Sequence, residues 1–152
     1  ACALGRRPPP AAVRCQPAGA CFSAHLANGS YAEARSACGR RRGDLAWVSG
    51  EEELGLLLEL LAEAAAAAGP APSLFWVGLK RNASACTDAE RPLRGFSWES
   101  GGGAVPQEVP AALGRWVKEP VRSCLMVRCA GLQLAAAGAA APGGGPGWGW
   151  KE

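Results

Sequence analysis

Several features that would indicate catalysis or membrane insertion are missing from this chain. No stretch of about 18 apolar residues is free of charge, because Glu59 and Glu63 interrupt the leucine-rich segment that begins at Leu54, so no membrane-spanning helix is predicted. Catalytic serine turns, phosphate-binding loops and paired carboxylates are not recognisable. The one histidine of the chain is His25, four residues after Cys21. A thiol enzyme that used this histidine as its base would need Cys21 to be free rather than disulfide-bonded. We therefore predict a protein that is not an enzyme and uses no cofactor.

Cysteine, in contrast, is plentiful. The chain has seven cysteines, spread along its length and never arranged as matched Cys-x-x-Cys pairs. That spacing is typical of a disulfide framework rather than a zinc site, and disulfides form in oxidising compartments. Two acceptor sequences for N-glycosylation, at Asn28 and Asn82, occur in expected surface loops. Together these features predict a secreted protein or the ectodomain of a cell-surface protein, made in the secretory pathway.

The length and composition favour one folded domain. With 152 residues, of which 49% are hydrophobic, the chain is long enough to bury a core. Its net charge of +3 permits an acidic partner without requiring one. Arg40, Arg41 and Arg42 form a basic run that is a candidate patch for a sulfated glycan, bound through guanidinium–sulfate pairs. The alternative, which we favour, is that these arginines interact with the dipole at the end of a helix.

The first part of the chain is expected to be an extended lead-in. Residues 1–14 contain three consecutive prolines, which disfavour a helix or a central strand. Residues 1–3 have the small-x-small form of a signal-cleavage site, so Cys2 is expected to belong to a leader remnant. The domain is expected to begin at Cys15, six residues before Cys21, across a short hairpin-like loop that can bring the two Cβ atoms within bridging range.

Two helices are expected next. Ser30 and Glu33 have the spacing of a capping box, which predicts a helix that runs to about Arg40 and stops at Gly43. Ser49, followed by three glutamates, offers the cap of a second helix that ends before Gly69-Pro70. Four leucines at helical spacing predict the buried stripe of this second helix: Leu54, Leu57, Leu58 and Leu61.

The remaining segments predict strands around a long loop. Strands are expected at residues 44–48, 74–79 and 127–134, and the glycine- and proline-rich stretch between Trp98 and Pro120 predicts a long irregular loop. Tryptophans bury large areas, so Trp76, Trp98 and Trp116 are predicted to contribute to the core.

The order of these elements resembles the C-type lectin-like fold over residues 15–152. This is an α+β fold in which two helices pack on small antiparallel sheets with a long irregular loop. The phrases LFWVGL at 74–79 and PLRGFSW at 92–98 carry the resemblance. Within the superfamily, Cys86, the phrases RSC at 122–124 and RC at 128–129, and WKE at 150–152 look like the group that contains thrombomodulin, endosialin and the complement C1q receptor. The resemblance implies a domain that is C-terminally incomplete, truncated before its last strand.

The resemblance also implies a disulfide pairing. The implied pairs are Cys15 with Cys21 and Cys86 with Cys124. Cys38 and Cys129 would then pair with cysteines of the last two strands, beyond Glu152. A local pair of Cys124 with Cys129 is an alternative that the sequence leaves open.

Calcium binding is tested by the residues at the family's ligand positions. Sugar-binding lectins of this family supply oxygens from Glu-Pro-Asn or Gln-Pro-Asp in the long loop and from Trp-Asn-Asp in the next strand. Here the apolar Val121 follows Glu119-Pro120, and Lys151 places a cation between Trp150 and Glu152. Because calcium requires six to eight oxygen ligands and is repelled by a cation, no metal site is predicted.

The resemblance further implies an adhesion receptor of endothelial cells that supports migration and vessel formation. The implied partner is an extracellular-matrix glycoprotein like multimerin-2, and a single membrane anchor would lie outside this chain. Loops on a bridged scaffold can vary without disturbing the core, so residues 98–120 are the candidate partner-binding loop. The alternative is a carbohydrate-binding module for heparan sulfate or for a calcium-bound sugar. The candidate contact residues of the loop are Glu99, Gln107, Glu108, Arg115 and Trp116.

Overall fold

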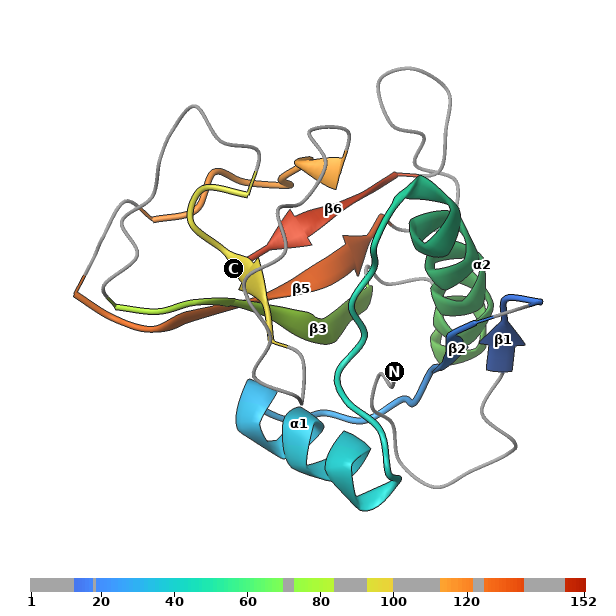
Figure 1. The fold of residues 1–152 in the computed structure, drawn as a ribbon. Coiled ribbons are helices and arrows are strands. Elements are labelled where there is room, and N and C mark those ends of the chain that lie inside the picture. Colours follow the sequence, from blue (N-terminus) through green and yellow to red (C-terminus); the bar gives the residue numbers. More distant parts are fainter. Residues whose placement is uncertain are drawn as a thin grey trace.

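A computed structural model of the chain describes residues 13–17, 19–69, 73–83, 93–99, 113–121, 125–135 and 147–152. These ranges form the α+β fold that the sequence predicts, with two helices and two small antiparallel sheets (Figure 1). The elements in chain order are β1 (Val13–Cys15), β2 (Cys21–Ser23), α1 (Tyr31–Arg40), α2 (Glu51–Ala68), β3 (Ser73–Arg81), β4 (Ser97–Trp98), β5 (Arg128–Leu134) and β6 (Trp148–Lys151).

The smaller sheet is a disulfide-bridged hairpin. Strands β1 and β2 pair antiparallel with Cys15 opposite Cys21. The two cysteines form a disulfide across a Cα separation of 4.0 Å. Arg14, between the register positions of Val13 and Cys15, forms a 3.0 Å ion pair with Glu63 of α2. The disulfide thus joins the two strands of the hairpin, and the Arg14–Glu63 ion pair joins the hairpin to α2.

Helix α1 begins at the capping box that the sequence predicts. The Ser30 hydroxyl accepts from the Glu33 amide at 3.3 Å, and the Glu33 carboxylate accepts from the Ser30 amide at 2.7 Å. The predicted end at about Arg40 is confirmed. Beyond it, Arg42 adopts a φ of 59°, and the amide of Gly43 donates to the carbonyl of Cys38 at 3.1 Å. The chain therefore turns at Arg42 and closes the helix through Gly43.

Helix α2 differs from the prediction at its start. Its N-cap is Gly50 and has no side-chain cap bond, so the predicted cap at Ser49 is wrong. Ser49 instead donates from its amide and hydroxyl to Glu53 at 2.6 and 2.9 Å. The buried leucine stripe is confirmed with one change, because Leu58 is only partly buried. The fully buried leucines are Leu54, Leu57, Leu60 and Leu61.

The larger sheet has the strand order β4-β3-β5-β6, all antiparallel. Strand β3 is irregular between Trp76 and Leu79, where Gly78 leaves the ladder. The Gly78 amide donates to Ala46 at 2.8 Å, and its carbonyl accepts from the Glu99 amide at 2.6 Å. Residues 44–48 are not assigned as a strand, so that prediction is wrong. The Ala46 carbonyl of this segment accepts from the Gly78 amide of β3, and Leu45 packs in the same small cluster as Trp76 of β3.

The main core lies between the larger sheet and α2. It includes Trp98 and Trp150, whose rings meet edge to face with centroids 5.7 Å apart. Trp116 is partly buried against the same core, as predicted, whereas Trp76 is partly buried in a second, smaller cluster with Tyr31 of α1. Over the described ranges, neither helix is both long and apolar enough to cross a membrane.

Candidate functional site

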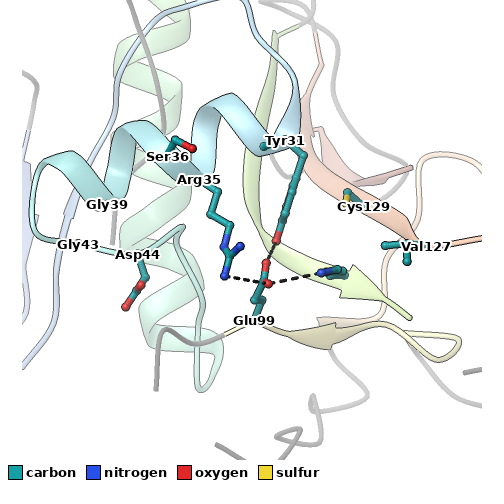
Figure 2. Close-up of a pocket in the computed structure, with 11 residues that line it drawn as sticks. Tyr31, Arg35, Ser36, Gly39, Gly43, Asp44, Glu99, Val127 and Cys129 are labelled. Atoms are coloured by element: carbon teal, nitrogen blue, oxygen red, sulfur yellow. Dashed lines mark hydrogen bonds and ion pairs between the residues drawn. The ribbon is translucent and has the colours of Figure 1, made fainter. Parts of the chain in front are cut away.

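A hollow of about 590 Å³ lies between α1, β3 and the start of β5 (Figure 2). Helix α1 contributes Tyr31 and Arg35, β3 contributes Lys80, and Glu99 follows β4. The floor is polar because these side chains converge on one carboxylate. The other lining residues are Ala32, Ser36, Gly39, Gly43, Asp44, Val127 and Cys129.

Glu99 is the centre of the hollow. Its Oε2 accepts a 2.7 Å hydrogen bond from the Tyr31 hydroxyl, and its Oε1 lies 3.4 Å from Arg35 and 3.5 Å from Lys80. Burial alone would raise the pKa of Glu99, but the Tyr31 hydrogen bond and the two cations outweigh it and hold the pKa below its ordinary value. Glu99 therefore stays ionised and ties α1 to the sheet.

The Tyr31 hydroxyl and the Cys129 thiol of the hollow are poor nucleophiles. Burial, together with the hydrogen bond and negative charge of Glu99, raises the pKa of Tyr31. Burial also raises the pKa of the Cys129 thiol, which Lys80 only partly offsets. Both groups are consequently protonated at neutral pH, and a protonated thiol is not a nucleophile. The hollow is suited to holding a polar group rather than to covalent chemistry.

A second arrangement of polar groups lies along β6, where residues 113–121 are bound to the sheet. Trp116 and Trp150 form a parallel bridge. The Val117 amide donates to the Trp150 carbonyl at 2.9 Å, and the Trp150 amide donates to the Arg115 carbonyl at 2.7 Å. The Trp150 indole also donates to the carbonyl of Leu113. This segment is therefore held by backbone hydrogen bonds like an additional short strand.

Two ion pairs involve the glutamates of the phrases that the sequence resemblance compares with calcium-ligand motifs. Glu119 forms a 2.7 Å pair with Arg94, and Glu152 forms a 3.0 Å pair with Arg128. The second oxygen of Glu152 accepts from the Val121 amide at 3.0 Å. Both carboxylates are thus neutralised by guanidinium groups. No group of three His, Cys, Asp or Glu residues is arranged to hold a metal within the part of the chain that the structure describes.

Arg81 binds the end of the segment formed by residues 113–121. Its side chain is fully buried, its Nη2 donates to the Val121 carbonyl at 3.0 Å, and its guanidinium lies 5.2 Å from the ring centroid of Phe96. Phe96 in turn contacts the ring of Trp116 at 5.1 Å. A buried cation with these contacts fixes the end of the segment over the sheet.

The structure separates the predicted contact residues of the long loop. Glu99 has its contacts with α1 and β3, whereas Arg115 stacks 5.5 Å over Trp148 and Trp116 packs beside Phe96. Gln107 and Glu108 lie outside the described residues, as do Cys2, Cys86 and Cys124. The predicted loop is therefore not one surface in its described parts.

The remaining predicted sites are on the surface or in the helix. Asn28 and Asn82 are both exposed. Arg40, Arg41 and Arg42 are exposed at the end of α1, and Arg41 donates to the Ala37 carbonyl at 3.1 Å. That bond agrees with the interpretation that these arginines serve the helix end. Cys38 is a buried residue of α1, whereas Cys129 borders the hollow.

The side chains that bind the carboxylates of Glu99 and Glu152 were not predicted from the sequence. Tyr31 and Arg81 were not predicted as site residues, and Arg128 was considered only as part of the phrase RC at 128–129. A weak signal existed for Arg81, since an arginine that continues the alternation of Phe75 and Leu79 into the core must find internal partners. The partners themselves come from distant segments and leave no local pattern.

Comparison of the sequence with known proteins places this chain in a family. The chain is 40% identical over 149 residues to C-type lectin domain family 14 member A of Mus musculus, an alignment that covers 97% of this chain. It is 38% identical over 118 residues to complement component C1q receptor and 38% over 100 residues to endosialin, both of Homo sapiens, covering 76% and 64% of the chain. The chain is a C-type lectin-like domain of this group.

The expected resemblance to this group is therefore confirmed, and so is the C-type lectin-like fold class. Three phrases of the sequence predicted a likeness to family 14 member A in particular: LFWV at 74–77, WVKEP at 116–120 and GWKE at 149–152. No family model matches the chain. The chain spans 30% of the length of the murine family 14 member and 17% of the human C1q receptor. The activities of those longer proteins consequently enter only as proposals.

Proposed function

We propose that this C-type lectin-like domain is the ectodomain of a cell-surface receptor and binds an extracellular protein without calcium. One observation carries the proposal: residues 113–121 are fixed to β6 by backbone hydrogen bonds, and the two nearby carboxylates, Glu119 and Glu152, are each paired with an arginine. A lectin that recognises sugar through calcium needs those carboxylates for the metal, whereas here they hold the loop itself. Protein groups thus hold the segment in place without a calcium ion, so it can present a fixed surface to a partner.

The proposed partner is an extracellular-matrix glycoprotein such as multimerin-2, and the proposed role is adhesion, migration and vessel formation by endothelial cells. The similarity to family 14 member A over 97% of the chain supports this assignment. The long loop is the proposed contact region, because loops on a rigid scaffold can change without disturbing the core. The disulfide-bridged hairpin and the sheet supply that scaffold here.

Replacing the long loop tests the proposal. Trp98 and Leu113 belong to the core, so the replacement must leave them in place and exchange only residues 100–112 for a glycine–serine linker. Binding to immobilised multimerin-2 is measured by surface plasmon resonance, with and without a calcium chelator. Loss of binding in the linker variant, with retained thermal stability and no effect of the chelator, supports the proposal. Unchanged binding, or binding lost on chelation, refutes it.

A second candidate is binding of heparan sulfate at the end of α1. Arg40, Arg41 and Arg42 are all exposed, so their guanidinium groups are accessible to sulfate. Changing Arg40 and Arg42 to alanine should lower the salt concentration that elutes the protein from heparin. The control is Arg14→Ala, which removes an arginine on the β1–β2 hairpin. Equal losses in both variants would show a response to net charge only.

A further inference from the structure

The turn that follows α1 contains the tripeptide Arg-Gly-Asp, formed by Arg42, Gly43 and Asp44. Helix α1 ends at Arg40, so the tripeptide connects the helix to the segment that packs against β3. In Figure 1 this end of α1 lies at the outer edge of the molecule, away from the larger sheet. The tripeptide is therefore on the surface of the domain.

The two charged side chains of the tripeptide are accessible and have no internal partner. Arg42 and Asp44 are both exposed, and neither forms an ion pair or a side-chain hydrogen bond with any residue that the structure describes. The nearby Arg35, in contrast, is paired with Glu99 at 3.4 Å. Figure 2 shows the Asp44 side chain at the border of the hollow and apart from that pair. Both charges are thus available to a partner.

The backbone of the turn is fixed although its side chains are accessible. The Arg42 amide donates to the carbonyl of Gly39 at 3.0 Å, and the Gly43 amide donates to that of Cys38 at 3.1 Å. On the other side of the tripeptide, Leu45 is 3% exposed and packs with Cys38 in the smaller core cluster. Because the turn is anchored before and after the tripeptide, it loses little conformational freedom when a partner binds.

Arg42 also has an unfavourable backbone conformation. Its φ of 59° lies in the left-handed region, which residues with a Cβ rarely adopt and in which glycine is more stable. The position after a helix cap is commonly glycine for this reason. An arginine here costs stability, and its side chain forms no ion pair within the described part of the chain that would compensate. Backbone strain of this kind is typical of binding sites.

We propose that Arg42, Gly43 and Asp44 bind an adhesion receptor of the integrin type. Opposite charges on either side of a glycine fit a receptor that has an acidic pocket for the guanidinium group and a divalent cation of its own for the carboxylate. A sulfated glycan would attract Arg42 but would be repelled by Asp44, so the pair of charges favours a protein. The inference is independent of the multimerin-2 contact proposed for residues 98–120.

The probe for this inference is the purified ectodomain of the vitronectin-receptor integrin, immobilised for surface plasmon resonance in manganese buffer. The 152-residue chain should bind, because the turn is exposed and already ordered. A chelator should abolish the binding, and a soluble cyclic Arg-Gly-Asp peptide should compete with it. Absence of binding in manganese, or binding that the peptide does not reduce, would overturn the proposal.

Two variants assign the binding to the tripeptide. Asp44→Glu should weaken it at least about tenfold, because the carboxylate moves by one methylene group while the net charge is unchanged. The matched control is Arg40→Ala, which removes an exposed arginine outside the tripeptide and should change the affinity less than about twofold. Equal binding of Asp44→Glu and wild type, or an equal loss in Arg40→Ala, would overturn the assignment.

Thermal denaturation shows whether these residues have a structural role instead. Asp44→Glu should have the thermal midpoint of the wild type, and a lower midpoint would overturn the assignment of Asp44. Arg42→Gly should raise the thermal midpoint by about 1–3 °C, because it relieves the left-handed backbone, and should abolish integrin binding. Retained integrin binding in Arg42→Gly would overturn the assignment of Arg42.

The chelator separates this inference from the proposed function. Binding of multimerin-2 should persist in chelator and in Asp44→Glu, whereas integrin binding should be lost in both. The variant with a glycine–serine linker at residues 100–112 should keep integrin binding. Multimerin-2 binding without integrin binding would refute this inference and leave the proposed function standing. Integrin binding without multimerin-2 binding would support the inference and refute that partner.

Discussion

Arg128 and Glu152 face each other across the start of β5 and the end of β6, with Nη1 and Oε1 3.0 Å apart. Glu152 simultaneously accepts from the Val121 amide. One carboxylate thus joins the sheet to the segment that follows the long loop. The charge of this carboxylate is balanced by a guanidinium group of the protein itself.

The first prediction follows from this pair. Arg128→Ala should lower the free energy of unfolding by about 1–3 kcal/mol, because it leaves the largely covered Glu152 carboxylate without its cation. Addition of calcium or of a chelator should leave the thermal midpoint of the wild type unchanged. Differential scanning fluorimetry measures both effects. The control is Arg14→Ala, whose pair with Glu63 is exposed on both sides and should contribute less than about 1 kcal/mol. Stabilisation of the wild type by calcium would contradict this account.

The second prediction concerns the glycine at which three segments meet. A Cβ at Gly78 would lie 3.2 Å from the Glu99 carbonyl oxygen and 3.3 Å from that of Leu45. Backbone atoms cannot move aside easily, so Gly78→Ala should destabilise the fold by about 1–3 kcal/mol in urea denaturation. Gly55→Ala is the matched control, since nothing lies near an added Cβ in the exposed part of α2, and alanine should stabilise the helix by about 0.5–1 kcal/mol. Equal effects in the two variants would contradict the packing argument.

The third prediction separates a helix cap from a glycosylation site. Ser30 caps α1 and is also the third residue of the acceptor sequence at Asn28. Ser30→Ala should cost about 1 kcal/mol of stability and abolish the glycan at Asn28, whereas Asn28→Gln should remove only the glycan. Ser30→Thr should retain both. Protein from a secreting eukaryotic host is compared by gel mobility, and its deglycosylated form by thermal denaturation. Equal stability of the deglycosylated Ser30→Ala and wild-type proteins would show that the cap contributes nothing.

These residues also show which parts of the fold could be predicted. The start of α1 could be predicted because a capping box consists of four consecutive residues. The buried face of α2 could be predicted because its leucines recur at helical spacing. Residues 44–48 were assigned wrongly to a strand, because apolar character permits a strand but pairing depends on a distant ladder. The hydrogen bond from Tyr31 to Glu99 spans 68 positions and leaves no trace in either local sequence.

The arginine–glutamate ion pairs were harder to predict than the fold, because their partners also come from distant segments of the chain. Lys151 and the absence of an amide after Pro120 argued against calcium from the sequence alone. That Glu119 and Glu152 pair with Arg94 and Arg128 could not be derived, since neither arginine lies near its glutamate in the chain. The prediction against calcium required only the residue types at the ligand positions. Predicting which arginines pair with the two glutamates required the folded structure.

The last prediction concerns pH. His25 lies with Nε2 3.0 Å from the Ser23 hydroxyl, and burial, followed by the positive charge of Arg41, lowers its pKa below the ordinary value of 6.5. The folded state therefore binds a proton less readily than the unfolded state, so this contribution to stability is present above about pH 6.5 and is lost as the pH falls toward the folded pKa. Urea midpoints measured between about pH 7.5 and 5 should fall for the wild type and change less for His25→Gln. The carboxylate of Glu99 does not confound this window, since its pKa lies below the ordinary value near 4.5. An identical pH slope in the variant would show that His25 is accessible to protons without cost, and would contradict the burial and the Arg41 contact as its cause.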